Sequence, residues 1–494
     1  MASAGHNAVV IGGGLGGLAA AVHLASAGRH VTLLEQSSQL GGKAGTKTVD
    51  GYRFDTGPSL LTMPHVFDEL FSSVGRSRSD YITFVPLSPL TGYWFHDGTF
   101  LRSDTIEPFV STLEEQLGVP SYESRAFFSY ARRLYEQAGT VFLNHSLHEW
   151  STYRSARVLS SLLRIWQIDP MRTMEQGIRR YTSSPQALQL FCRYATYNGS
   201  DPYQAPATLN NIAYVEHGLG GYAVKGGIYQ IVKGLETLLK ELGVTIRLNS
   251  RVDEITTVKG RVTGVLCGKE EIPASVVISD VDVLTLYTDL LKDSDAPLAK
   301  RYRRLSPSTS GVVFFWGMDR VFSDMGVHSI FFSKDYQKEC YRIHREAQIP
   351  EDPTVYVNIT SKVTPSDAPP GGENWFVLVN TPPDDGRRWD VEAPQLRRHV
   401  ISRISREVGL DITPHIRSES LLTPADIARE TGSWRGSLYG ISSNSRAAAF
   451  MRHPNRSRRY RGLYLCGGSV HPGGGMPLAL LSGKIAAQLA GRYS

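Results

Sequence analysis

Residues 8–17 read Ala-Val-Val-Ile-Gly-Gly-Gly-Leu-Gly-Gly, an apolar run that passes directly into a glycine-rich turn. A short apolar run of this kind is typical of a buried parallel strand. Residues 15–27 are mostly small or apolar and predict a closely packed helix that ends near Gly28, and residues 30–34 predict a second strand. This order of strand, turn, helix and strand is typical of a dinucleotide-binding α/β unit.

The turn holds the pattern G-x-G-x-x-G at Gly12, Gly14 and Gly17, with Gly16 inside it. Glycines at these places permit a tight bend, close approach of the backbone to a pyrophosphate, and close packing of the helix on the strand. The N-terminus of the helix offers free N–H groups to the same anion. Glu35 ends the second strand, 18 residues after Gly17, where a carboxylate accepts hydrogen bonds from ribose hydroxyls.

The next segment indicates which dinucleotide is bound. Residues 41–46, Gly-Gly-Lys-Ala-Gly-Thr, resemble the second nucleotide-contact motif of FAD proteins of the amine oxidase and desaturase superfamily. Gly42 lets the backbone approach the cofactor, and Lys43 is suited to meet a phosphate as a point charge. A plain NAD dehydrogenase does not need this motif, so the predicted cofactor is FAD, and Gln36 is included among its contacts.

Five further segments, spread over most of the chain, resemble the bacterial phytoene-desaturase-type carotenoid desaturases in sequence and in order. They are residues 51–59, 225–227, 356–362, 368–374 and 462–477. The resemblance implies an α/β, two-domain FAD-binding fold with a discontinuous, glutathione-reductase-like Rossmann domain and an α+β substrate domain. It also implies cofactor contacts from Gly57, Pro58, Ser59, Val252, Gly467, Gly468, Met476 and Pro477, with Val252 against the adenine end through its backbone.

Two stretches resemble one branch of this family, the 3,4-desaturases of hydroxylated or methoxylated acyclic carotenoids. They are residues 434–440, Trp-Arg-Gly-Ser-Leu-Tyr-Gly, and residues 467–475, Gly-Gly-Ser-Val-His-Pro-Gly-Gly-Gly. The branch implies an oxidoreductase acting on CH–CH groups, which desaturates a 1-hydroxy or 1-methoxy carotenoid at C3–C4. In that reaction a hydride passes to flavin N5, a proton is lost, and oxygen or a quinone finally accepts the electrons.

Several alternatives remain open at this stage. Phytoene desaturases, carotenoid isomerases and saturases share the same motifs. An amine oxidase shares them too, but Cys466 lacks the motif for covalent flavin attachment. Rab escort and GDP-dissociation-inhibitor proteins use a related fold to hold prenylated partners without redox chemistry, and the intact glycines with Glu35 and Lys43 favour cofactor binding over that function.

The motifs divide the chain into five expected segments. The FAD-binding domain takes three of them, residues 1–104, 211–285 and 456–494. The substrate domain takes a helical, membrane-associated region at 105–210 and a strand-rich region at 286–455. Apolar strands near residues 311–316 and the helical region are expected to line a tunnel for the carotenoid.

The sequence offers no firm catalytic side chain. His471 lies in the closing glycine motif and is the candidate catalytic residue. The favoured interpretation, however, is that its side chain only forms hydrogen bonds with backbone groups. His217 has a similar standing. Neither the four separated cysteines nor any histidine cluster has the spacing of a metal site, so no metal is expected.

The formal net charge of +6 is compatible with a solvated surface, and no nucleic-acid partner is predicted. Residues 151–180 are rich in arginine, with leucines and Trp166 between, as in segments that lie at a membrane interface. The alternative is a packing helix with a solvated basic face. No secretory signal and no span of about 18 apolar residues is recognised, so the chain is expected in the cytoplasm, peripherally attached to a membrane.

Overall fold

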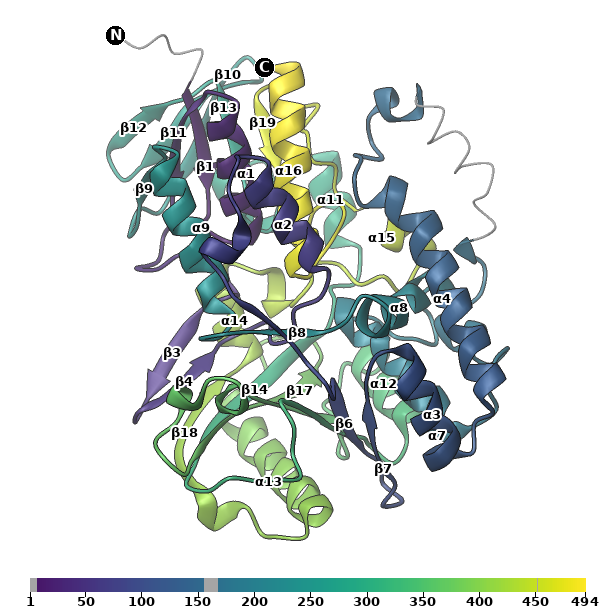
Figure 1. The fold of residues 1–494 in the computed structure, drawn as a ribbon. Helices are drawn as coiled ribbons and strands as arrows, with labels where there is room; N and C mark the ends of the chain where they lie inside the picture. Colours follow the sequence, from purple (N-terminus) through teal and green to yellow (C-terminus); the bar gives the residue numbers. More distant parts are fainter. Residues whose placement is uncertain (1–6, 155–167, 451) are drawn as a thin grey trace.

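The computed structural model describes residues 7–154, 168–450 and 452–494. A five-stranded parallel sheet lies at one end of the molecule (Figure 1), in the order β19-β13-β1-β2-β9. Its strands come from the beginning, middle and end of the chain, as the sequence predicts. They are β1 (Asn7–Ile11), β2 (His30–Leu34), β9 (Thr245–Arg247), β13 (Val276–Ser279) and β19 (Leu463–Leu465).

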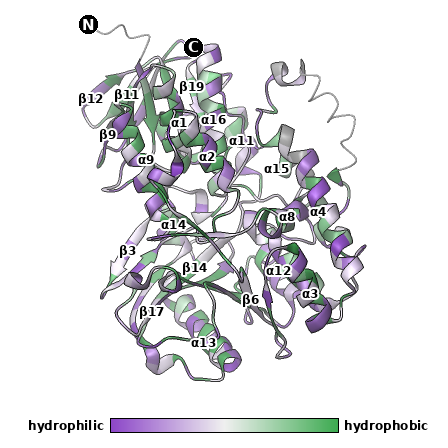
Figure 2. Ribbon diagram, viewed as in Figure 1, coloured by the Kyte–Doolittle hydropathy of each residue, from purple (hydrophilic) through white to green (hydrophobic). Residues whose placement is uncertain are grey.

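Both faces of this sheet are covered, which explains why its strands are apolar throughout. Val10 points to a core shared with the helices α1 (Leu15–Ser26), α9 (Tyr229–Glu241) and α16 (Met476–Tyr493). Val9 points to the opposite core, shared with a three-stranded antiparallel sheet. Figure 2 shows green, apolar residues in β19 and, together with purple polar ones, in α1 and α16. The three strands are β10 (Glu254–Val258), β11 (Arg261–Cys267) and β12 (Glu270–Pro273).

A seven-stranded mixed sheet forms the second unit, in the order β18-β14-β17-β16-β15-β6-β7. One face packs on α13 (Trp389–Val408), with Phe314 and Trp316 in that core, whereas Val313 and Phe315 point to the other face. The strands are β6 (Thr91–Trp94), β7 (Phe100–Ser103), β14 (Ser310–Met318), β15 (His328–Phe331), β16 (Val355–Ile359), β17 (Glu373–Thr381) and β18 (Ile416–Leu422).

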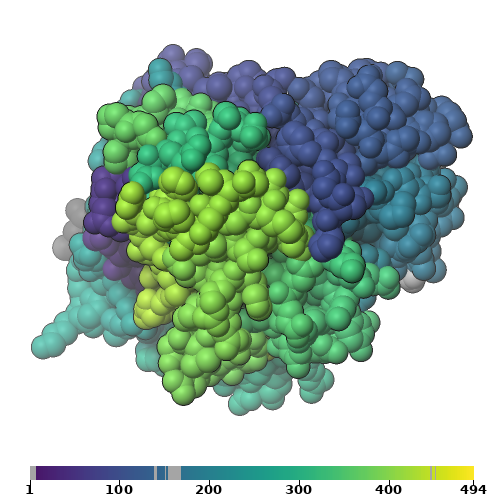
Figure 3. All heavy atoms as spheres, turned by 90° about the horizontal axis from the view of Figure 1, so that it is seen from below, coloured from purple at the N-terminus to yellow at the C-terminus, as the bar shows by residue number. Residues whose placement is uncertain are grey.

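The sheet pairing shows that the chain passes from the FAD-binding unit to the large sheet earlier than expected. β6 and β7 lie within residues 1–104, the expected first FAD-binding segment, yet β6 pairs in parallel with β15 of the large sheet. Seen from below (Figure 3), blue residues from the N-terminal part of the chain accordingly lie against green residues from its C-terminal half. Local sequence shows that a strand forms but not which sheet it joins, because pairing partners are distant along the chain.

A helical layer fills the flank of the large sheet around an aromatic core that includes Phe109, Phe127 and Phe191. Its main helices are α3 (Ile106–Leu117), α4 (Ser121–Phe142), α7 (Pro185–Cys192) and α8 (Asn211–His217). α8 packs on α4 although it lies within the expected second FAD-binding segment. The other α-helices and strands of the described ranges are β3 (Thr46–Val49), β4 (Tyr52–Asp55), α2 (Pro64–Ser72), β5 (Phe84–Pro86), α6 (Met174–Ile178), β8 (Tyr222–Val224), α10 (Val283–Thr285), α11 (Pro297–Arg303), α12 (Tyr336–His344), α14 (Pro424–Thr431) and α15 (Arg446–Phe450).

The hairpin of β3 and β4 joins the two units through one arginine. Arg53 forms ion pairs with Asp367 at 2.6 Å and with Asp55 at 2.9 Å. Asp55 also accepts hydrogen bonds from the N–H groups of Ile228 and Tyr229 at the start of α9. The segment that leads to residues 57–59 is therefore held to both units by charge-assisted hydrogen bonds.

Candidate active site

A continuous cavity of about 980 Å³ runs from the C-terminal edge of the parallel sheet to one face of the large sheet. This volume is at the upper end of those found for cofactor and ligand pockets. Fifteen of the sixteen expected cofactor residues line it and Gly17 does not; the catalytic candidate His471 does not line it either. The fifteen are Gly12, Gly14, Gly16, Glu35, Gln36, Gly42, Lys43, Gly57, Pro58, Ser59, Val252, Gly467, Gly468, Met476 and Pro477.

The glycine turn is held in its shape by Glu35 and by its own backbone. The carboxylate of Glu35 accepts hydrogen bonds from Gly13 N–H at 2.7 Å and Ser37 N–H at 2.8 Å. Gly12 has a φ of +94°, and a Cβ at Gly17 would collide with the carbonyl oxygen of Gly12. Gly17 therefore shapes the turn from behind the cavity wall, and Glu35 fixes the turn in addition to any contact with a ribose.

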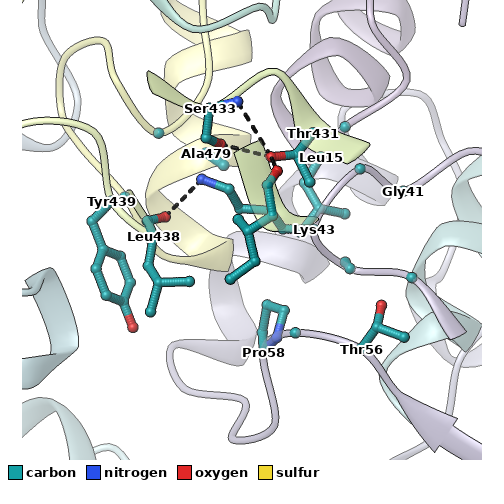
Figure 4. A pocket seen from close by; sticks show the side chains of 18 of the residues that line it. Leu15, Gly41, Lys43, Thr56, Pro58, Thr431, Ser433, Leu438, Tyr439 and Ala479 are labelled. Atoms are coloured by element: carbon teal, nitrogen blue, oxygen red, sulfur yellow. Dashed lines mark hydrogen bonds between the residues drawn. The ribbon is translucent and has the colours of Figure 1, made fainter. Parts of the chain in front are cut away.

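Lys43 reaches across the cavity to the opposite wall (Figure 4). Its ammonium donates hydrogen bonds of 2.9 Å to the carbonyl oxygens of Ser437 and Leu438. Burial lowers the pKa of Lys43 to about 8, partly offset by the negative charges of Asp282 and Asp280. Lys43 thus ties the turn at residues 41–45 to the segment at 437–438, in addition to offering its charge to a phosphate.

Asp280 is a site residue that the motif comparison missed. It follows β13 directly, and a Cβ at Gly14, Gly16 or Gly467 would collide with its carboxylate. Three expected cofactor glycines therefore surround this carboxyl group. The available signal was its position after a buried strand, because side chains at the C-terminal ends of parallel strands face the ligand crevice.

Burial raises the pKa of the Asp280 carboxyl to about 7, opposed mainly by a hydrogen bond from Gly17 N–H. Since the folded-state pKa lies above the unfolded value, this group favours the folded state most below about pH 4, and that contribution is lost as the pH rises through about 7. The same ionisation places a negative charge beside the glycine turn. A pyrophosphate would be repelled more strongly as the pH rises.

We expect the affinity for FAD to fall as the pH rises through about 7, the pKa of Asp280, by at most about tenfold per pH unit, since one proton is linked to binding. In Asp280→Asn the slope should vanish, because the neutral amide keeps the shape without the charge. Fluorescence titration of the apoprotein with FAD measures both profiles below the range in which Lys43 loses its proton. Equal slopes in the two proteins would rule out Asp280 as the titrating group.

The far part of the cavity is floored by two rows of side chains in register across the large sheet. Because side chains alternate along a strand, residues two apart share a face. The first row runs Leu422, Val313, Leu378, Tyr356 and Ile330, and the second runs Ser420, Phe315, Phe376, Asn358 and His328; all of them except Asn358 line the cavity. Four strand spacings of about 4.8 Å separate β18 from β15, so the floor is about 19 Å long.

The middle of this floor is apolar and its β15–β16 end is polar. At that end Tyr356 makes hydrogen bonds with Ser59 at 2.6 Å and with His328 at 2.7 Å. Arg193 also lines this end, with its guanidinium against the rings of Tyr194 and Tyr197. The expectation that residues 311–316 and the helical region line the cavity agrees with Val313, Phe315, Arg193, Thr196 and Tyr197 in its wall.

The side chain of His471 forms a hydrogen bond with the backbone. Its Nε2–H donates to the carbonyl oxygen of His145 at 2.9 Å, and burial lowers its pKa to about 3. His217 is likewise buried, between Tyr194 and the carbonyl oxygen of Asp104. Within the described residues no group of three or more His, Cys, Asp or Glu side chains is arranged to hold a metal ion.

Comparison with known proteins agrees with this architecture. The family described as flavin-containing amine oxidoreductase matches residues 15–490. A 1-hydroxycarotenoid 3,4-desaturase of Flavobacterium is 39% identical over 483 residues, which cover 98% of each chain. A 4,4'-diapolycopene oxygenase of Methylomonas is 35% identical, over 97% of this chain and 96% of that protein.

Among solved structures, a variant of putrescine oxidase has a TM-score of 0.65 at 14% identity, over 99% of both chains. Cyclohexylamine oxidase from Brevibacterium oxydans has a TM-score of 0.61 at 16% identity, also over 99% of both chains. At these identities the likeness shows the two-domain FAD-binding fold alone.

The cavity fits FAD by the chemistry of its wall. Gly14, Gly16 and Gly467 leave backbone exposed where a pyrophosphate needs close approach, at the N-terminus of α1. Glu35 and Val252 line the part that an adenosine would take, and Gly57, Pro58 and Ser59 line the opposite end. With this lining, its match over residues 15–490 and a 39% identical relative that aligns over 98% of both chains, the chain belongs to the flavin-containing amine oxidoreductase family, among its bacterial carotenoid desaturases.

Proposed function

We propose that the protein desaturates an acyclic carotenoid bearing a 1-hydroxy or 1-methoxy group at C3–C4, with FAD as cofactor. The observation that carries this is the long apolar floor of Val313, Leu378, Phe315 and Phe376, which begins beside the FAD cradle. A rigid polyene needs an elongated, apolar site of this kind. The Flavobacterium relative, by its name, acts on a 1-hydroxycarotenoid at the same position.

When bound, FAD supplies the hydride acceptor. The substrate loses a hydride and a proton from adjacent carbons, and oxygen or a quinone finally takes the electrons. The protein's part is to align the chain and to exclude water. A C–H next to a polyene is activated because the developing positive charge is delocalised. No strong base is therefore required of the cavity wall.

We also propose that the protein works in the cytoplasm at a membrane surface, where such a substrate is dissolved. Tyr122 and Trp150 in the helical layer are 71% and 79% exposed, as aromatic residues at a bilayer interface are. Residues 155–167 of the expected membrane segment, including Arg157, Arg164 and Trp166, lie outside the described residues. In the described part, Arg172 pairs with Asp169 and Arg179 with Glu175. No helix in the described ranges is long and apolar enough to cross a membrane.

The test uses liposomes that contain a 1-hydroxylated acyclic carotenoid, incubated with the protein, FAD and a quinone. We expect a red shift of the visible spectrum and a product two hydrogens lighter by mass. We also expect the protein to sediment with anionic vesicles and to be released by salt, because attraction to a charged surface is screened.

Other outcomes point to the alternatives. If FAD is bound and the carotenoid is unchanged, the same assay with phytoene and with cis-carotenoids tests the desaturase and isomerase alternatives. Turnover of an amine instead would assign an amine oxidase. If the protein binds no FAD, the result would favour the escort-type function, in which a related fold binds prenyl chains without redox chemistry.

A further inference from the structure

The polar end of the cavity floor contains buried nitrogen atoms that have no hydrogen-bond partner among the described residues. His328 is 2% exposed, lines the cavity, and its Nε2 has no hydrogen-bond partner among the described residues. Nearby Arg193 lines the same end, and its Nε is likewise buried without a partner there. A polar group buried without a partner is costly, so each one calls for an explanation such as a ligand.

The surroundings of His328 determine which ring nitrogen carries the proton. Asn358 Nδ2, which can only donate, lies 3.2 Å from His328 Nδ1 and also donates to the carbonyl oxygen of Val327. The hydroxyl of Tyr356 lies 2.7 Å from the same Nδ1. Nδ1 is therefore the acceptor, and in a neutral imidazole the proton is then on Nε2.

The ring is neutral and its partners stay protonated. Burial lowers the pKa of His328 to about 4, and burial raises the pKa of Tyr356. A continuous chain results, in which Ser59 O–H donates to Tyr356, Tyr356 O–H donates to His328 Nδ1, and Nε2–H is left to donate to a ligand. Donors in such a chain polarise one another, which strengthens the last hydrogen bond.

We propose that His328 Nε2–H donates a hydrogen bond to the oxygen on C1 of the carotenoid end group and so selects oxygenated over hydrocarbon ends. The proposal rests on the proposed function and names the residue that gives it specificity. Because the protein donates and the substrate oxygen accepts, a hydroxyl and a methoxy group satisfy the site equally, whereas a hydrocarbon leaves the donor unpaired.

The position of this donor agrees with the position of the reaction. Ser59, at the start of the chain of hydrogen bonds, lines the end of the cavity opposite the adenosine part, where the flavin of a bound FAD would lie. In the substrate the oxygen on C1 is separated from C3 by two carbon atoms only. An end group held at His328 thus places C3 and C4 near the cofactor, and the rest of the polyene extends over Phe376 and Phe315 toward β18.

The experiment compares three polyenes of equal conjugation, with a 1-hydroxy, a 1-methoxy or an unsubstituted end. Equilibrium binding to the FAD-loaded protein in detergent micelles is read from quenching of tryptophan fluorescence, and kcat/KM is measured in liposomes. In His328→Phe, both quantities should fall about tenfold to hundredfold for the two oxygenated polyenes, with little change for the hydrocarbon. His328→Gln, which keeps a donor, should restore part of the loss.

Ile330→Val serves as the matched control, because Ile330 lies on the same strand and the same cavity wall but has no polar atom. It should change all three polyenes by the same factor. If His328→Phe loses FAD, Tyr356→Phe replaces it and should give a smaller loss with the same selectivity, since His328 then keeps only Asn358 as a donor to Nδ1.

A parallel loss for all three polyenes in His328→Phe, or wild-type binding without preference for an oxygenated end, would overturn the proposal. Failure of the proposed function looks different. In that case the wild type binds FAD and converts none of the polyenes, while oxygen-selective binding and its dependence on His328 persist.

Discussion

Gly17→Ala should yield a protein that has lost FAD, with an affinity reduced more than about 100-fold. The added Cβ collides with the carbonyl oxygen of Gly12, a backbone atom at the centre of the glycine turn. Relief requires the start of α1 to move away from β1, which displaces the N–H groups that face the pyrophosphate. Overpacking of a rigid backbone site costs about 3 kcal/mol, which corresponds to that change in affinity.

The flavin absorbance of the purified variant and a fluorescence titration of its apoprotein measure this effect. Gly491→Ala is the matched control, since a Cβ at Gly491 in α16 meets nothing within 4 Å. There the same substitution should leave FAD binding intact and stabilise the helix by up to about 1 kcal/mol. Full FAD occupancy in Gly17→Ala would show that the turn is not the pyrophosphate site.

Leu378→Asp should abolish carotenoid turnover while the protein keeps its FAD. Leu378 lies in the middle of the apolar floor, between Val313 and Tyr356, and away from the cradle at residues 12–17. A carboxylate there must be desolvated when the polyene covers it, which costs several kcal/mol. We expect kcat/KM to fall at least about 100-fold.

Leu378→Met keeps the volume and the apolar character and should retain activity within about tenfold. Flavin absorbance and thermal unfolding of both variants establish that the fold and the cofactor are intact. Normal turnover by Leu378→Asp would place the carotenoid elsewhere, and loss of FAD from that variant would mean that the floor and the cofactor share this part of the cavity.

The cofactor site is the part of this protein that local sequence predicts best. The apolar run before Gly12, the spacing of Gly12, Gly14 and Gly17, and the predicted strands and helix all describe contacts between neighbours in sequence. Their structural counterparts are β1, α1 and β2, with bounds close to those expected. Such motifs can be recognised in a sequence because a tight turn restricts residue type by backbone geometry alone.

Asp280 is a site residue that local sequence does not predict. Its carboxyl is a part of the cradle only because β13 lies beside β1, and Gly467 joins it because β19 lies beside β13. The sequence near residue 280 does not indicate that Gly14, Gly16 or Gly467 lies beside it. Strand order is decided by packing of the whole sheet, so a polar residue at a strand end becomes a site residue only when its neighbours are known.

Local patterns in the sequence therefore establish the dinucleotide unit, the FAD motifs and the family resemblance. Those patterns do not show that β6 joins the large sheet, that His471 lies away from the cavity wall, or that Ser59, Tyr356 and His328 form one chain of hydrogen bonds. Ser59 and Tyr356 are 297 residues apart in the chain. Contacts of that kind arise from sheet register and burial, which depend on the entire fold rather than on any local pattern.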